Sequence, residues 1–327
     1  MTGTTLNFDG LYMPRKSFDL FNDSSELVSS TDLTTHRLIE VAMGRYNKEV
    51  DDYWRKMDGV WAREEAAFLG QDKPYHEFLP GRFFTYETIA QKIINELGDC
   101  TSDSETLDLG CGSGICLAIQ AKKGVGRVRG FDRSYAALNF LEDLATHYNV
   151  RGNVETRQGD FYATGYDADR FDATFNLGVF EHLKPNDQGI LMDEMVRVTK
   201  PGGIILVAIP NESSGLHKAS RAREKGFMEY VLPMLKQHHA VDLTRLFEDR
   251  DIGILRRDST LIAPPSAIPV RYFSKADLEA YSKLPKMTGA NNPDELMKFW
   301  RVMEEKVISP EDRIRMGWHT YIIGKKS

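Results

Sequence analysis

The chain has 327 residues, of which 41% are hydrophobic and 10% aromatic, enough for a sizeable core in one large domain or in a domain with an elaborated cap. Its 42 Lys and Arg against 48 Asp and Glu give a formal charge of −6, without a basic run or tail, which disfavours a nucleic-acid partner. No signal-peptide pattern and no apolar run long enough for a membrane span are found, so we expect no membrane association. Three cysteines are too few for a disulfide framework and indicate a reducing cytoplasm.

The first 80 residues are predicted to be mainly helical. Polar residues 1–25 have the composition of an irregular arm, and Ser30-Thr-Asp32 is a helix N-cap signal. Apolar spacing predicts a long helix to about residue 57, a second helix over 60–69 and then a loop over 73–81. Aromatic side chains of this segment are candidates for lining a pocket, although aromatics at helical spacing pack more often in a core: Tyr46, Tyr53, Trp54, Trp61, Tyr75 and His76.

The most informative stretch follows a helix predicted over 82–97. Residues 106–114 read Thr-Leu-Asp-Leu-Gly-Cys-Gly-Ser-Gly, a short strand that runs into three alternating glycines, and a helix follows at 115–123. Glycine is needed where the backbone turns sharply or closely approaches a ligand. A strand, a glycine turn and a helix N-terminus together predict a nucleotide-type cofactor site. The dinucleotide fingerprint is excluded because Ile115 stands where it requires glycine.

Four further strands are predicted downstream, each ending in polar or turn residues. The second, over 127–132, ends at Asp132, an acidic position suited to accept hydrogen bonds from a ribose diol. The third spans 154–161, and the fourth spans 171–177 and leads into residues 178–183. A Pro-Gly-Gly turn precedes a fully apolar fifth strand over 204–211.

Gly110, Gly112 and Gly114, preceded by Asp108, resemble motif I of the class I S-adenosylmethionine (SAM)-dependent methyltransferases, and the later signals follow the order of that family over about residues 83–211. The resemblance implies an α/β fold, a Rossmann-like sheet with helices on both faces, plus an N-terminal helical cap and an insertion after strand five. It implies SAM as the cofactor, with an acidic side chain at the adenine amino group and an apolar neighbour over the ring. The residues that we expect at the cofactor are Asp108, Gly110, Cys111, Gly112, Gly114, Asp132, Arg133, Asp160, Phe161 and Asn176.

On this basis we divide the chain into an N-terminal helical arm and lid over 1–82 and a SAM-binding core over 83–327. An insertion over about 212–270 is expected to lie over the substrate crevice, because insertions at the carboxyl ends of strands do so in open α/β sheets. Ser274 is expected to cap a helix, and residues 318–324 form the predicted terminal strand. Residues 285–316 depart from the usual sixth strand of the family, so that edge of the sheet is not assigned.

Methyl transfer from a sulfonium is an in-line displacement, for which correct positioning alone supplies about 7–11 kcal/mol of the barrier. A base is needed only when the acceptor arrives protonated. Glu181 and His182, after strand four, are the catalytic candidates, although this pair also serves packing or helix-start roles in the family. Glu212 and His217 are further candidates, and no cluster has metal-ligand spacing.

The favoured function is methyl transfer from SAM to N or O of a small molecule, a metabolite or natural-product intermediate. Three alternatives stay open: a protein or peptide methyltransferase, another group transfer from the same cofactor such as aminopropyl transfer, and a non-catalytic SAM-binding partner subunit. The sequence identifies neither the acceptor nor the oligomeric state, for which a homodimer is one alternative.

Overall fold

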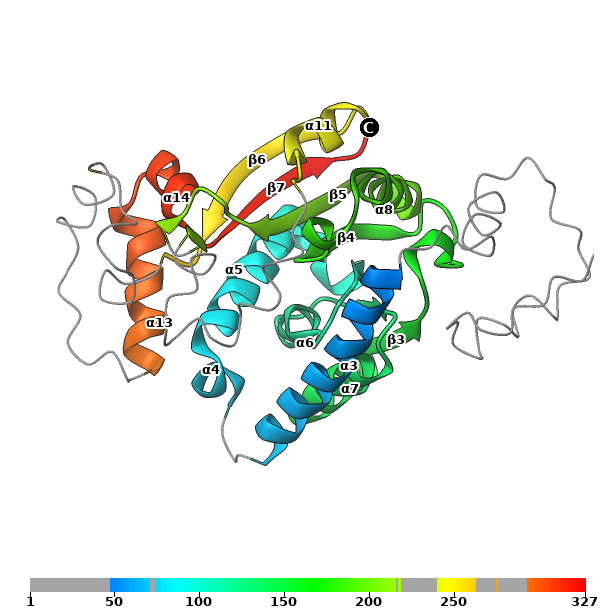
Figure 1. Ribbon diagram of the computed structural model, residues 1–327, viewed down its shortest axis with the longest axis horizontal. Coiled ribbons are helices and arrows are strands. Elements are labelled where there is room, and N and C mark those ends of the chain that lie inside the picture. The colour runs from blue at the N-terminus through cyan, green and yellow to red at the C-terminus, as the bar shows by residue number, and fades with distance from the viewer. Residues whose placement is uncertain (1–47, 71–73, 216, 219–239, 263–274, 276–292) are drawn as a thin grey trace, which may run out of the picture.

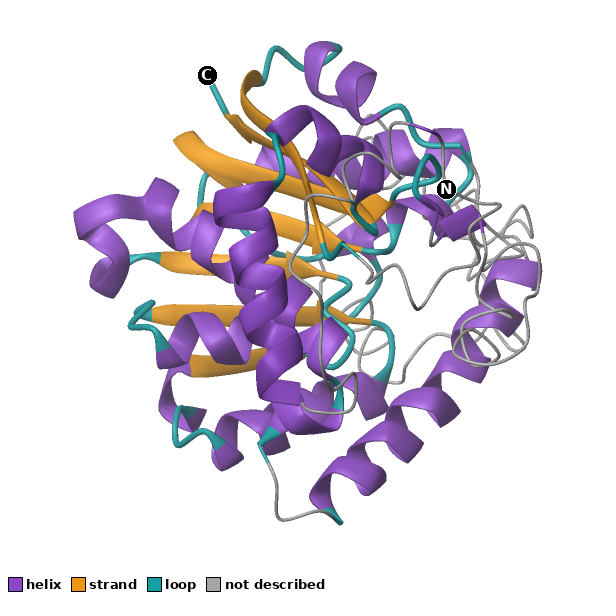
Figure 2. Ribbon diagram, turned by 90° about the vertical axis from the view of Figure 1, so that its left-hand side faces the viewer, coloured by secondary structure: helices purple, strands orange, loops and turns teal. Residues whose placement is uncertain are grey.

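The computed structural model describes residues 48–70, 74–215, 217–218, 240–262, 275 and 293–327. Its centre is a seven-stranded sheet in the order β3-β2-β1-β4-β5-β7-β6, with helices on both faces (Figures 1 and 2). This confirms the predicted Rossmann-like α/β fold. The strands are β1 (Glu105–Leu109), β2 (Arg127–Asp132), β3 (Val154–Gln158), β4 (Phe171–Leu177), β5 (Thr199–Pro210), β6 (Gly253–Thr260) and β7 (His319–Lys325).

The strand directions bring the ends of several strands to one edge. β1, β2, β3, β4 and β5 pair in parallel, whereas β7 lies antiparallel between β5 and β6. The carboxyl ends of β1, β4 and β5 therefore share an edge with the first residue of β7. The chain moves outward from β1 in both directions, through β2 on one side and β4 on the other, and ligands bind at such a switch point in open α/β sheets.

Helices cover both faces because the central strands are apolar on both sides. Leu206 and Ala208 of β5 pack in the cluster beneath α5, α6 and α7, whereas Ile205 and Val207 pack in the cluster beneath α8 and α11. The α-helices are α3 (Lys48–Leu69), α4 (Tyr75–Phe78), α5 (Pro80–Leu97), α6 (Ile115–Lys122), α7 (Tyr135–His147), α8 (Pro185–Val198), α11 (Leu243–Glu248), α13 (Pro293–Val302) and α14 (Pro310–Met316). Short 3-10 helices are η2 (Gly98–Asp103), η3 (Arg151–Asn153), η4 (Phe161–Ala163) and η5 (Phe180–His182), and η8 (Met303–Val307) is a π-helix.

The sixth strand lies earlier in the chain than the sequence suggested. The helix α11, capped by Asp242, and a turn at Asp251 lead into β6, all inside the stretch 212–270 that we interpreted as an insertion. That interpretation is wrong for residues 253–260, which complete the sheet by pairing with β7. The described part of residues 285–316 instead forms α13, η8 and α14. Ser274 lies outside the described residues.

The N-terminal segment also differs from the expected pair of helices. α3 runs without interruption through Gly59, so the predicted break near residue 58 is wrong, and α4 lies inside the predicted loop. Glycine costs a helix only about 1 kcal/mol. Packing of α3 along α7, where the Phe68 and Phe140 rings lie 6.1 Å apart, outweighs that cost (Figure 1). The arm over 1–25, the N-cap signal and Tyr46 lie outside the described residues, as do the side chains of Tyr53 and Trp54.

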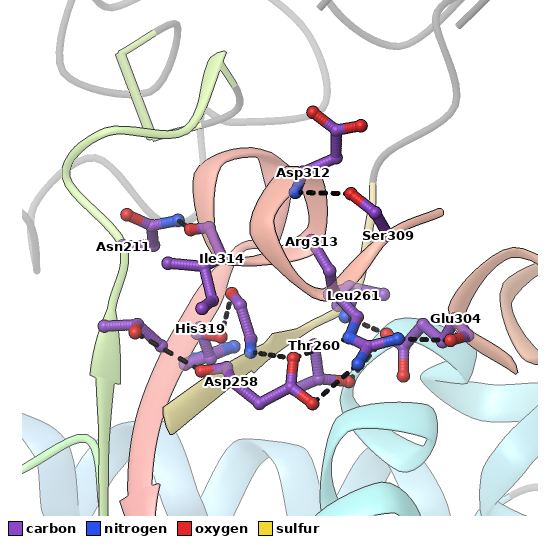
Figure 3. A network of polar contacts seen from close by, with 12 residues as sticks. Asn211, Asp258, Thr260, Leu261, Glu304, Ser309, Asp312, Arg313, Ile314 and His319 are labelled. Carbon is purple, nitrogen blue, oxygen red and sulfur yellow. Dashed lines mark hydrogen bonds and ion pairs between the residues drawn. The ribbon is translucent and has the colours of Figure 1, made fainter. Parts of the chain in front are cut away.

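A buried polar network fastens the segment between β6 and β7 to the sheet (Figure 3). Asp258 of β6 accepts two hydrogen bonds from Arg313 of α14, at 2.6 and 2.7 Å. Glu304 of η8 accepts hydrogen bonds from the Thr260 hydroxyl at 2.9 Å and from the Leu261 amide at 2.6 Å. Burial raises the pKa of Glu304 to about 7, against the opposing effect of these two hydrogen bonds.

We predict that Glu304→Gln flattens the pH dependence of stability. A carboxyl whose folded-state pKa lies above its unfolded value binds more protons in the folded state, so its contribution falls as the pH rises from about 4.5 to about 7. The variant should gain on the order of 3 kcal/mol relative to wild type across this interval, since one pKa unit corresponds to about 1.4 kcal/mol. Urea unfolding at pH 4.5, 6 and 7.5 measures the difference. The exposed neighbour Glu305, changed to Gln, should leave the slope intact, and an identical slope in both variants would contradict the prediction.

Candidate cofactor and active site

The glycine loop turns directly after β1 and is packed too tightly for side chains. Gly110, Gly112 and Gly114 all have positive φ, at 89°, 49° and 65°. A Cβ at Gly110 would come within 2.7 Å of Val179, and one at Gly114 within 2.6 Å of Leu141. The alternating glycines therefore allow the loop to lie against the turn after β4 and against α7.

Asp132 at the end of β2 is held by the backbone of this loop. One carboxylate oxygen accepts the Gly112 amide at 2.8 Å, and the other accepts the Ser134 amide at 2.8 Å. Burial raises the pKa of Asp132, and the two amides act against that rise. The carboxylate is thus fixed beside the glycine loop, with lone pairs left for further donors. The assignment of Asp132 to a ribose diol stays a prediction that this geometry fits.

Several buried polar atoms around the loop lack a hydrogen-bond partner among the described residues. They include Asp108 Oδ1, Ser113 Oγ and Asn176 Oδ1. Asn176 donates its amide to the Leu109 carbonyl, which fixes its oxygen at the same strand end. Burial, and next the charge of Asp132, raise the pKa of Asp108 well above its usual range. Buried polar atoms are rarely left unsatisfied in native proteins, so this group marks a place where a ligand supplies donors.

The residues expected at the adenine lie at the end of β3. Asp160 caps η4 by accepting the Tyr162 amide at 3.2 Å, and its other oxygen lies 3.7 Å from the Arg133 guanidinium. The Phe161 and Tyr162 rings stack with their centroids 4.6 Å apart. The structure thus brings Arg133, Asp160 and Phe161 together next to Asp132, as the resemblance implies, and their contacts with adenine stay predictions.

Cys111 is the member of the predicted set whose side chain faces away from a ligand. Its thiol packs in the hydrophobic cluster under α6 and α7, close to Gly130, and burial raises its pKa. Its backbone amide and carbonyl are used within the loop, by Phe131 and Gly114. The residue therefore fills space, and a nucleophilic role has no support from its surroundings.

The helix α3 lies over the glycine loop. The Trp61 ring packs against Gly112, so that a Cβ at Gly112 would lie only 2.9 Å from it. The Arg82 guanidinium lies 5.6 Å from the centroid of the Trp61 ring. Asp58 Oδ1 is buried without a partner among the described residues, near enough to Asp132 to raise its pKa. Trp61 was expected on the inner face of this segment, whereas sequence reasoning missed Asp58 because an acidic residue on a helix has no local signature.

Glu181 and His182 form η5 after β4. Both are buried, and His182 Nε2 lies 3.8 Å from Glu181 Oε1. Glu181 Oε2 has no hydrogen-bond partner among the described residues, and burial raises the pKa of this carboxyl to about 8. A carboxyl with this pKa can bind or release a proton near neutral pH, as an acid–base group must.

Further groups line the same edge towards β7. Glu64 of α3 is buried, pairs with Arg82 of α5 and accepts a hydrogen bond from Tyr75 at 2.6 Å. Tyr86, one turn after Arg82, is near enough to Asp108 for its pKa to be affected by that charge. The pKa of His319, the first residue of β7, is lowered by burial and likewise by the charge of Arg82. These contacts join residues far apart in sequence, so no local pattern could have identified them.

Two expectations for pocket-lining residues need correction. Tyr75 is fully buried among Phe68, Phe78 and Phe140, so it belongs to the core rather than to a pocket wall. His76 lies 3.5 Å from Asp294 of α13, away from the glycine loop. Of the weaker catalytic candidates, Glu212 is exposed, whereas His217 is buried with its ring 5.7 Å from that of Trp318.

These residues fit SAM as the bound group. Its ammonium, ribose hydroxyls and adenine amino group are donors, and the loop offers unpartnered acceptors on Asp108 and Asn176 next to the fixed carboxylate of Asp132. The positive φ of the three glycines lets the loop turn directly after β1, beside these acceptors. Among the described residues no group of three or more His, Cys, Asp or Glu is arranged to hold a metal ion.

The chain is similar in sequence to known methyltransferases. Residues 107–207 match the family described as "Methyltransferase domain". The chain is 29% identical over 217 residues to the methyltransferase GfsG of Streptomyces halstedii, covering 62% of this chain and 75% of the relative. It is 28% identical over 184 residues to the ubiquinone biosynthesis O-methyltransferase of Pseudoalteromonas translucida (55% and 67%). It is 28% identical over 145 residues to the ribosomal protein L11 methyltransferase of Shewanella halifaxensis (44% and 45%).

The motif order, the strand order and the family match identify the chain as a class I SAM-dependent methyltransferase, and its cofactor is SAM. The matched residues include the glycine loop, Asp132, Asp160 and Glu181. Within the part of the chain that the structure describes, every helix is too short or too polar to cross a membrane.

We predict that Asp132→Ala weakens SAM binding about 10- to 100-fold, because hydrogen bonds to a charged group contribute about 1.5–3 kcal/mol. Isothermal titration calorimetry measures the affinity, and circular dichroism checks that the fold is retained. Asp249→Ala, at an exposed position after α11, is the matched control and should bind SAM normally. Unchanged affinity in the Asp132 variant would remove the ribose assignment.

Proposed function

We propose that the protein transfers the methyl group of SAM to N or O of a small molecule, in the cytoplasm. The observation that carries this proposal is the group of buried, unpartnered polar atoms that extends from the glycine loop to Glu181 along one edge of the sheet. The relation to GfsG and to a ubiquinone biosynthesis O-methyltransferase supports a small acceptor. The free, buried Cys111 and Cys116 support a reducing compartment.

When bound, SAM supplies an electrophilic methyl group, whose bond to sulfur breaks with the electron pair left on sulfur. The acceptor contributes the lone pair of the new bond, so an acceptor that arrives as a hydroxyl or an ammonium must also lose a proton. The residues of this chain hold the acceptor in line and exclude water, which is where most of the acceleration originates. We propose that Glu181, buried beside the end of β4, takes the proton.

A small acceptor is also supported by burial. The candidate groups on the acceptor side are enclosed, with Glu181 at 5% exposure and His217 at 1%. α3 adds a cover over the glycine loop through Trp61. This burial favours a small molecule, or a slender side chain of a protein, over a folded protein surface. The relation to a ribosomal protein methyltransferase keeps the protein or peptide alternative open.

Turnover of small hydroxyl and amine compounds, measured as release of S-adenosylhomocysteine, distinguishes a small-molecule methyltransferase from a protein or peptide methyltransferase. SAM binding without turnover of any class of acceptor would favour a non-catalytic partner subunit.

We predict that Glu181→Gln lowers turnover about 10²-fold, the usual contribution of a positioned base. The carboxyl has its pKa raised to about 8 and is active as a base only when ionised, so turnover of the wild type should rise with pH up to about 8. The variant should lose this dependence while keeping its affinity for SAM. Normal turnover with reduced thermal stability would show that Glu181 is structural, and the same measurements on His182→Ala test its neighbour.

The N-terminal segment is proposed to act as a lid, with α3 as the described helix that lies over the glycine loop. We predict that amide exchange in α3 slows when S-adenosylhomocysteine and acceptor are both bound, because Trp61 and Asp58 then face a filled site. Hydrogen exchange with mass spectrometry measures this, with α8, on the opposite face of the sheet, as internal control. Equal protection of α3 in the free and bound protein would refute the lid.

A further inference from the structure

A second pair of ligand-facing groups lies beyond Glu181, where β7 begins. His319 pairs with Pro210 of β5 on one side and with Thr260 of β6 on the other. Because β7 is antiparallel, its first residue lies at the edge where β4 and β5 end. His319 also shares the face of Tyr321 and Ile323, which is the face that α5 covers.

The surroundings of His319 keep its imidazole neutral. Burial, and next the charge of Arg82 and the ring of His217, lower its pKa to about 3. The Trp318 ring lies 5.9 Å from the His319 ring and 5.7 Å from that of His217. The charge of Arg82 is balanced by the buried carboxylate of Glu64. This end of the site is therefore aromatic and polar but carries no uncompensated charge.

Some buried polar atoms at this edge lack hydrogen-bond partners among the described residues. They include His319 Nδ1 and Glu181 Oε2. Leaving such an atom unsatisfied costs about 1–3 kcal/mol, so two at one edge indicate that a bound molecule satisfies them. Glu181 is only 5% exposed, which rules out bulk solvent as its regular partner.

We infer that Glu181 and His319 bind the methyl acceptor at the edge where β4 and β5 end and β7 begins, and that this acceptor is an uncharged hydroxyl compound held by a hydrogen bond from a hydroxyl to Nδ1 of His319, separate from the proton that Glu181 takes. The inference rests on the proposed function and narrows its acceptor class. A neutral imidazole nitrogen accepts a hydrogen bond from a hydroxyl. An ammonium would find the buried Glu64 carboxylate already paired with Arg82. A carboxylate or phosphate would find Arg82 already paired.

The test uses the full chain saturated with S-adenosylhomocysteine, labelled with ¹⁵N-histidine. Phenol, benzylammonium, benzoate and toluene serve as probes, since they share a ring and differ in charge and in the hydroxyl. The His319 resonances are assigned by their absence from the spectrum of His319→Gln. We expect phenol to shift them and to bind at least tenfold more tightly than the other three probes.

Variants separate a ligand contact from a structural role. His319→Leu, which removes the acceptor nitrogen, should weaken phenol binding at least tenfold, whereas His319→Gln, which keeps a hydrogen-bond acceptor, should retain most of it. Both should bind S-adenosylhomocysteine with unchanged affinity. The matched control is His147→Gln on α7, whose ring packs against Phe68, and it should bind all probes as wild type does.

Each outcome decides the inference. It is overturned if no probe binds, if His319 resonances stay in place while phenol binds, if benzylammonium or benzoate binds more tightly than phenol, or if His319→Leu keeps the phenol affinity. Failure of the proposed function has a different signature: SAM and phenol bind as expected, but no hydroxyl or amine compound is methylated. Turnover of an amine with His319 unperturbed would leave the proposed function standing and remove the hydroxyl site.

Discussion

The close approach between the glycine loop and the turn after β4 determines the geometry of the whole site. Gly110 packs directly against Val179, so any side chain at residue 110 would push apart the two segments that carry Asp108 and Glu181. Gly114 packs in the same way against Leu141 of α7, which fixes the position of α7 and, through the contacts between α7 and α3, the position of α3. One backbone constraint thus sets the separation between the cofactor side and the acceptor side, and positioning to within a fraction of an ångström is what methyl transfer requires.

Three carboxyl groups around the glycine loop influence one another electrostatically. Asp58, Asp108 and Asp132 surround the loop, and burial raises the pKa of the latter two. An arrangement of this kind opposes folding in the absence of a ligand, because buried acids without partners are costly. A cationic ligand relieves the repulsion. We therefore interpret these carboxyl groups as the source of a binding preference for the positively charged cofactor over its neutral product.

Much of the fold could be predicted from local sequence because the central strands are apolar and bounded by turns. β2 and β4 have the predicted limits, and the acidic and glycine positions at their ends are brought together as expected. The sixth strand was missed because β6 is an edge strand whose first five residues are largely exposed, so its Arg-Arg-Asp sequence shows no apolar run. Arg82, Glu64 and His319 could not be predicted as a site, since Arg82 and Glu64 meet through the packing of α5 against α3 and His319 reaches this edge through the antiparallel insertion of β7.

The position of β7 has a consequence for how the protein folds. This strand lies between β5 and β6, although both precede it in the chain. Until residues 319–325 are available, β5 presents an open edge of apolar residues and β6 has no partner in the sheet. Exposed strand edges pair readily with other chains, and pairings over long sequence separations form slowly. Closure of the sheet is therefore the late, aggregation-prone step of folding, and the same step delivers His319 to the acceptor side, so that the site is completed only when the sheet is.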